Sequence, residues 1–276
     1  MVIASFFYFS VFVLGLAIGS FLNSIIYRLH TGESFLFQRS YCPRCKKNLG
    51  WQDLIPLLSF LILRGKCRYC KKPIPWQYPL VELATGLLFV FIFRQDATLL
   101  LSGYTALIFL RIGFLLLASC FLIIIFISDL KYYIIPDKII YPAIIISLIV
   151  NSLIALQQYG FSKKAIWLMA NGWLAAFGAA AFFLLIVLVS RGKWMGWGDP
   201  KLVLFMGLLL GFPKIILALF LAFLIGAIMG IGLIISGKKT LKSEVPFGPF
   251  LVIGTFVALF WGGILIDWYL NLFWQI

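Results

Sequence analysis

Long apolar runs alternate along this chain with short polar connections that are rich in lysine and arginine. Several runs reach about 18 residues, the length at which an α-helix crosses the roughly 30 Å hydrocarbon core of a bilayer. The pattern predicts eight spans, at 4–27, 78–93, 99–127, 139–156, 165–190, 201–211, 214–236 and 248–266. The third is too long for one straight crossing, so we expect its membrane part at about 111–127, after an interfacial piece. The sixth is short and runs close to the seventh through the helix-breaking residues Gly211-Phe212-Pro213.

The composition indicates the same class of protein. Hydrophobic residues make up 63% of the 276 residues and charged residues only 12%, which is far from the balance of a soluble domain. A membrane β-barrel would show alternating segments of about ten residues, and the chain has none. The first run has no basic stretch before Arg28, which favours a permanent helix over a removable signal peptide. We therefore expect an all-α polytopic membrane protein of about eight transmembrane helices.

The basic residues predict how the chain is oriented. The segment 28–77 contains ten lysines and arginines, and the loops near 128–138, 191–201 and 237–247 add eight, against five on the other side. Cytoplasmic loops carry such an excess, so these segments are expected in the cytoplasm and both termini outside. This asymmetry explains the net charge of +14 without a nucleic-acid partner. The predicted domains are a first transmembrane helix (1–27), a cytoplasmic insert (28–77) and a membrane bundle (78–276).

The insert contains two C-x-x-C pairs, Cys42 with Cys45 and Cys67 with Cys70. Four thiolates form a closed tetrahedral site that typically holds structural Zn²⁺. Disulfides or free thiols are the alternative, and the reducing cytoplasm disfavours disulfides. Because an insert of some fifty residues has too small a core to fold alone, a metal would supply folding energy. Cys120 stands alone in an apolar run and is expected to be packing.

Candidate catalytic groups are found among the nine acidic residues of the chain. Asp129 and Asp137 bracket the point where a span reaches the cytoplasmic face, and Asp199 lies in a glycine-rich turn, Gly196-Trp197-Gly198-Asp199. A lone acid at such a boundary could simply be solvated or cap a helix. Two carboxyl groups held close together cannot both ionise easily, so one can hold a proton while the other activates water. Composition alone does not show that Asp129 and Asp199 meet.

Other catalytic classes find little support in the sequence. There is no G-x-S-x-G motif and only one histidine, His30, which argues against a Ser-His-Asp triad and an H-E-x-x-H metal site. A proton-coupled transporter would place acids near the middle of spans, whereas these lie at the ends. It would also leave the four cysteines unexplained. A zinc-stabilised scaffold without catalysis remains a further alternative.

Several motifs in order make the chain resemble the bacterial type IV prepilin peptidases, also called prepilin leader peptidase/N-methyltransferases. The motifs are the paired cysteines together with GSFLNSIIYRL (19–29), IPLLSFLILRGKC (55–67), YPLVE (78–82), SDLKYYIIPD (128–137), GWGDPKL (196–202) and PFGPFL (246–251). The resemblance covers nearly the whole chain.

The resemblance implies a membrane aspartic endopeptidase in the bacterial cytoplasmic membrane. Asp129 and Asp199 match the family's two catalytic aspartates, and Cys42, Cys45, Cys67 and Cys70 match its zinc ligands. Such enzymes remove the basic leader of type IV prepilins or type II secretion pseudopilins, after a glycine, at the cytoplasmic face. Many then methylate the new amino terminus with S-adenosylmethionine. A member with peptidase activity alone is the alternative, and no S-adenosylmethionine site can be located in the sequence.

Overall fold

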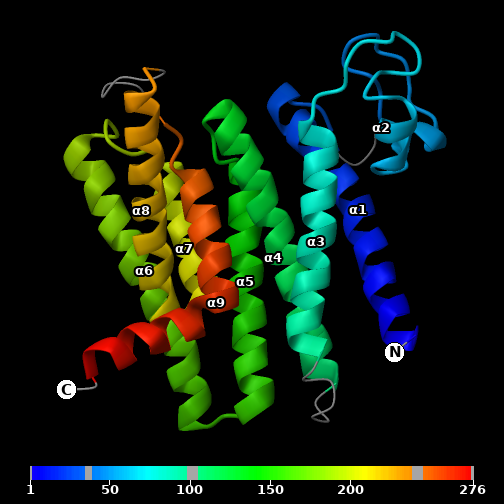
Figure 1. The fold of residues 1–276 in the computed structure, drawn as a ribbon. Helices are drawn as coiled ribbons and strands as arrows, with labels where there is room; N and C mark the ends of the chain where they lie inside the picture. Colours follow the sequence, from blue (N-terminus) through cyan, green and yellow to red (C-terminus); the bar gives the residue numbers. More distant parts are fainter. Residues whose placement is uncertain (1, 35–38, 98–104, 238–244, 275–276) are drawn as a thin grey trace. The chain divides into compact units, whose positions relative to one another are not determined.

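The computed structural model describes residues 2–34, 39–97, 105–237 and 245–274, and these are mostly helical (Figure 1). Seven helices are long and apolar enough to cross a membrane. They are α1 (Val2–Thr31), α3 (Gln77–Ala97), α4 (Thr105–Tyr132), α5 (Asp137–Tyr159), α6 (Lys163–Ser190), α8 (Lys214–Ile235) and α9 (Gly248–Trp274). Three shorter elements are η1 (Trp51–Leu54), α2 (Leu58–Ile62) and α7 (Gly198–Leu210). The predicted all-α membrane fold is confirmed.

Two of the predicted spans differ in detail from the helices. The predicted span 201–211 corresponds to α7, which has 13 residues and is therefore about 20 Å long, too short to cross the hydrocarbon core alone. Residues 99–104 of the predicted third span lie outside the described residues. From Thr105 onward the helix α4 is continuous through Arg111, so the described part has no separate interfacial piece.

The chain forms two compact units, residues 1–124 and 125–276, with α4 beginning in the first and ending in the second. In the first unit, glycines bring α1 and α3 into close contact. A Cβ atom added to Gly19 would lie 2.7 Å from the Cα of Glu82, and one added to Gly15 would lie 2.7 Å from the Cα of Gly86. Small residues at such crossings let membrane helices approach closely, which gains van der Waals packing where there is no hydrophobic driving force.

The second unit is built around α7, which packs against α5, α6 and α9. The side chains of Leu202, Val203, Phe205 and Met206 are fully buried. A Cβ atom on Gly207 would collide with the backbone of Ala176 in α6. The short helix is therefore enclosed by its neighbours, which explains how it is tolerated in an apolar bundle.

Two asparagines satisfy backbone groups where α7 ends. Asn151 of α5 donates its side-chain amide to the carbonyl oxygen of Leu208 at 2.8 Å, and Asn171 of α6 accepts the Phe212 N–H at 2.9 Å. Backbone groups without partners are costly in an apolar medium, so a helix that stops short needs such side chains.

We expect Gly207→Ala to destabilise the second unit, because the added methyl group must displace the α6 backbone. Overpacking of this kind costs about 1–3 kcal/mol. Gly178→Ala in α6 is the matched control, since a Cβ there meets nothing within 4 Å. The midpoint of thermal unfolding in detergent should fall for Gly207→Ala and not for Gly178→Ala. Equal midpoints for both variants would contradict the packing described here.

Candidate active site and metal centre

Asp129 and Asp199 are both buried in the second unit, each with only 7% of its surface exposed. Asp129 lies in the last turn of α4, and Asp199 lies in the first turn of α7. Figure 1 shows α5, α7 and α9 starting at the same end of this unit. The two predicted carboxyl groups are thus placed at one end of the bundle by helix termini rather than by a loop.

The amino terminus of α9 holds the Asp129 carboxylate. The Gly248 N–H donates a hydrogen bond to Oδ2 of Asp129 at 2.9 Å. A Cβ atom at position 248 would lie 2.6 Å from that same oxygen, so no other residue allows the contact without a shift. The partial positive charge of a helix amino terminus also favours a negative group there. The Gly248 N–H and the α9 amino terminus therefore favour a negative charge on Asp129, whereas its burial opposes that charge.

The surroundings of Asp199 favour its protonated form. Burial, and to a smaller extent the negative charge of Asp129, raise the pKa of the Asp199 carboxyl group to about 7. That interaction requires the two carboxyl groups to be near each other, which composition alone could not show. A carboxylate that accepts a backbone N–H beside a carboxyl group that keeps its proton is the arrangement expected of an acid–base pair.

Asp137, the third acid of this region, has a different role in the structure. Its Oδ1 accepts a 2.6 Å hydrogen bond and ion pair from Nζ of Lys201, and the Lys201 ammonium also lies 5.0 Å from the centre of the Tyr141 ring. This bond ties the start of α5 to the first turns of α7. It also engages the positive charge that lies two residues from Asp199.

In the first unit, the sulfur atoms of Cys42, Cys45, Cys67 and Cys70 lie within 4.8 Å of one another. This cluster can hold a metal ion, because one ion can be reached by all four thiolates. Cys120 is buried in α4, within an apolar helix, and is not part of the cluster. The sequence prediction of two cooperating C-x-x-C pairs therefore agrees with the geometry.

The two cysteine pairs have the same backbone conformation, a similarity that the sequence analysis missed. In the first loop, the Cys42 N–H donates to the Lys47 carbonyl and the Lys46 N–H donates to the Cys42 carbonyl. In the second loop, the Cys67 N–H donates to the Lys72 carbonyl and the Lys71 N–H donates to the Cys67 carbonyl. Lys46 and Lys71 both have φ near +59°. The sequence C-x-x-C-K-K, which both loops share, was the signal that could have predicted this common conformation.

Backbone donors in these loops also favour a thiolate. Burial opposes ionisation of Cys42, but hydrogen bonds from the Cys45 and Arg44 backbone lower the pKa of its thiol to about 7. A thiolate is the form that binds metal.

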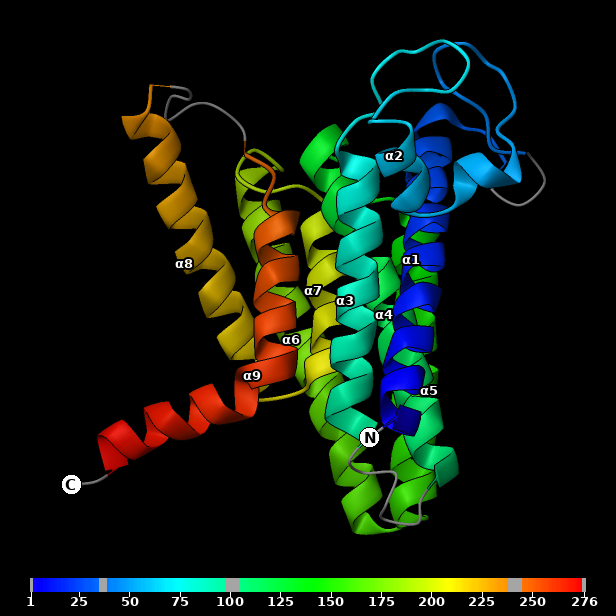
Figure 2. The ribbon, with the colours of Figure 1, turned by 45° about the vertical axis from the view of Figure 1, so that its right-hand side comes forward.

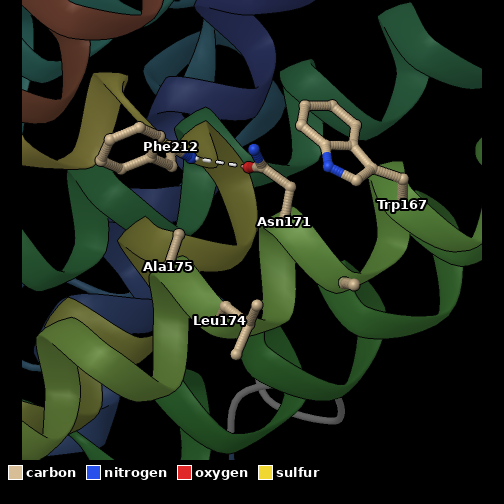
Figure 3. Close-up of a pocket in the computed structure, with 6 residues that line it drawn as sticks. Trp167, Asn171, Leu174, Ala175 and Phe212 are labelled. Carbon is tan, nitrogen blue, oxygen red and sulfur yellow. Dashed lines mark hydrogen bonds between the residues drawn. The ribbon is translucent and has the colours of Figure 1, made fainter.

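A pocket of about 380 Å³ lies on α6, lined by Trp167, Ala170, Asn171, Leu174, Ala175 and Phe212 (Figure 3). Phe212 follows the carboxyl end of α7, whereas Asp199 lies at its amino end. One polar atom of the lining residues, Oδ1 of Asn171, is already bonded to the Phe212 N–H. The pocket therefore belongs to the end of α7 opposite the carboxyl pair.

Two contacts near the predicted residues were not foreseen. Gly248 belongs to the motif PFGPFL, but nothing in the sequence linked it to Asp129, 119 residues away. Glu82, which follows YPL, is buried and accepts the Leu57 N–H of the insert at 2.9 Å. A glycine followed by proline at the start of an apolar run was the one local signal for the first contact.

Fold and site together define a polytopic membrane protein with a buried carboxyl pair and a four-cysteine centre. Two family models match the chain: the bacterial peptidase A24 N-terminal domain at residues 13–95 and the type IV leader peptidase family at residues 116–231. The chain is 34% identical to the prepilin leader peptidase/N-methyltransferase of Aeromonas salmonicida strain A449, over 96% of this chain and 94% of that one. It is 30% identical to the protein of the same name from Bacillus subtilis strain 168, over 95% and 97%. No solved structure matches.

The chain therefore belongs to the type IV leader peptidase family. The first family model covers the cysteine insert, and the second covers Asp129, Asp199, the last part of α4 and all of α7.

We expect the purified protein to contain one tightly bound metal ion per chain. Cys67→Ser should lose the ion and destabilise the insert, because three thiolates close the site less well than four. Cys120→Ser is the matched control and should retain it, since that thiol lies outside the cluster. Elemental analysis of each variant gives the metal-to-protein ratio. A wild-type protein without metal, or a Cys67→Ser variant with full occupancy, would contradict the prediction.

Proposed function

We propose that the chain is a membrane aspartic endopeptidase that removes the basic leader of type IV prepilins or type II secretion pseudopilins. The observation that carries the proposal is the buried pair, with Asp129 bonded to the α9 amino terminus and Asp199 beside it. The relatives named prepilin leader peptidase/N-methyltransferase support the substrate class. A transporter reading has no comparable support.

In the proposed reaction, the ionised Asp129 takes a proton from a water molecule, which attacks the scissile carbonyl carbon. The protonated Asp199 donates its hydrogen bond to the carbonyl oxygen as negative charge develops there. The tetrahedral intermediate then collapses, the C–N bond breaks and the leaving amine receives a proton. The hydrogen bond from the Gly248 N–H supports the ionised role for Asp129. Because the two groups interact, their protons titrate as those of one pair.

We assign the metal in the four-cysteine centre as Zn²⁺, which prefers four thiolates in tetrahedral geometry. Four protein ligands leave no open position for water or substrate, so the ion stabilises the insert and takes no part in cleavage. The insert and the carboxyl pair are proposed to lie on the cytoplasmic side of a bacterial cytoplasmic membrane, which the excess of lysine and arginine supports.

The second proposed activity is methylation of the new amino terminus with S-adenosylmethionine as methyl donor. The printed names of the relatives support it. Within the described residues we assign no binding site for the donor and derive no step through it. A peptidase without this activity is the alternative, and the mass of the mature substrate distinguishes the two.

Asp129→Asn and Asp199→Asn should each abolish leader removal, because an amide neither takes a proton from water nor donates one as a carboxylic acid does. The loss in kcat/KM should be on the order of 10³-fold or more. Asp137→Asn is the control: it removes an exposed ion pair and should leave most of the activity. Mass spectrometry of a prepilin incubated with each purified variant measures cleavage. Normal cleavage by either of the first two variants would rule out the proposed mechanism.

Cleavage should slow as the pH rises above about 7. Asp199 keeps its proton below its raised pKa and loses it above, so the fraction of enzyme with one proton on the pair falls about tenfold per pH unit on the alkaline side. The rate of a single turnover, measured from pH 5 to 9, shows this alkaline decrease. A rate that stays constant to pH 9 would show that Asp199 does not act in its protonated form.

Gly248→Ala should reduce cleavage strongly, because its methyl group would displace the Asp129 carboxylate. We expect a loss of about 100-fold, in line with a small misplacement of a catalytic group. Gly230→Ala in α8 is the matched control, since a Cβ there meets nothing within 4 Å. The same mass-spectrometric assay compares the two variants. Unchanged activity in Gly248→Ala would mean that the contact with Asp129 is not required.

A further inference from the structure

The short helix α2 of the insert presents an apolar face that the insert does not use for its own packing. Leu58, Leu61 and Ile62 stand at positions i, i+3 and i+4, so they share one side of the helix. Their exposed fractions are 56%, 68% and 76%. Leu54, the last residue of the preceding 3-10 helix η1, is also exposed. We call Leu54, Leu58, Leu61 and Ile62 the α2 apolar face.

The opposite side of α2 is the one that packs. Phe60 contacts Trp76, with ring centroids 5.2 Å apart, and its ring lies against Gly65. Trp76 itself remains 71% exposed, and Trp51 is 75% exposed. Contiguous exposed apolar surface on a small module marks an interaction site. Tryptophans are the side chains most enriched at the boundary between membrane and water.

One hydrogen bond fixes the depth of α2 along the first unit. The Leu57 N–H, immediately before α2, donates to Oε2 of Glu82 at 2.9 Å. Glu82 is the sixth residue of α3, a helix that can span the membrane. At 1.5 Å per residue it lies about 7 Å inside the start of that helix. Figure 2 shows α2 beside the first turns of α3, as in Figure 1.

This depth is the one at which helices lie flat in a membrane interface, roughly 5–10 Å into the boundary between headgroups and acyl chains. Trp76 also connects α2 to the exposed side of α3. The Leu80 N–H bonds to the Trp76 carbonyl, so Leu80 lies one turn further along, and Leu87 follows on the same side. Both leucines are more than half exposed on a spanning helix. The exposed apolar side of α3 therefore begins at Trp76, the residue on which the packed side of α2 rests.

The charge of the insert fits a bilayer rather than a basic peptide. Residues 28–77 contain ten lysines and arginines and two acids, Glu33 and Asp53. Arg64 and Lys66, directly after α2, are exposed. Basic residues beside a membrane surface are attracted to anionic lipid. The same charges would repel the basic leader of the proposed substrate.

We propose that the cysteine insert is seated in the membrane, with the α2 apolar face in the headgroup–acyl boundary and with Arg64 and Lys66, beside α2, on anionic headgroups. Glu82 is the positioning residue that sets this depth. The inference needs the insert on a lipid surface and holds whatever reaction the carboxyl pair performs.

The test uses the full-length, metal-loaded protein in vesicles of phosphatidylcholine and phosphatidylglycerol. An environment-sensitive fluorescent amino acid replaces Ile62, and Lys72, exposed in the second cysteine loop, is the matched control position. Lipids with a nitroxide near the glycerol group should quench the probe at 62 several-fold more than the probe at 72. Aqueous iodide should show the reverse order. Metal content confirms that each labelled protein is folded.

Equal iodide quenching at both positions would overturn the proposal, because position 62 would then lie in water. Shielding of position 62 that appears only when prepilin is added would also overturn it, since the face would then bind protein. A Glu82→Ala variant with full metal content tests the positioning role. Its probe at 62 should move toward the aqueous quencher, and an unchanged depth would exclude Glu82 as the residue that sets it.

Discussion

A carboxylate buried among apolar helices must have a partner, and this requirement organises the second unit. Without compensation, the desolvation cost of such a group is several kcal/mol. Asp129 is compensated by the Gly248 N–H at the start of α9. That contact requires a glycine and a helix that begins at residue 248. The short α7 carries Asp199 to the same end of the unit. The close packing of Gly207 on Ala176 then keeps α7 in place.

The cysteine insert solves a related problem with different chemistry. It is too small to fold on a core of its own, and its four sulfur atoms converge in one cluster. Its start is held by the Tyr41 hydroxyl group, which donates to the Glu33 carboxylate, and its α2 by the Glu82 carboxylate. In both units, therefore, few acidic residues are present, and those that are buried accept backbone N–H groups at defined points.

Local patterns were enough to predict much of the fold and the identity of the candidate residues. Apolar runs predicted the spanning helices, the spacing of the C-x-x-C pairs predicted the cluster, and the turn before Asp199 marked it as unusual. What local patterns lack is long-range contact. The bond from Gly248 to Asp129 joins residues 119 apart, and the pairing of Lys201 with Asp137 joins residues 64 apart. The shortness of α7 was predicted, but not the bonds by which Asn151 and Asn171 of neighbouring helices satisfy backbone groups at its end.

The central claim is that Asp129 and Asp199 act as one catalytic unit. The most direct measurement is the rate of prepilin cleavage by Asp129→Asn, by Asp199→Asn and by the variant that carries both changes. If the two groups share one role, each single change should reduce the rate as far as the double change does. Two partial losses that multiply in the double variant would show that the residues act independently, and would contradict this account.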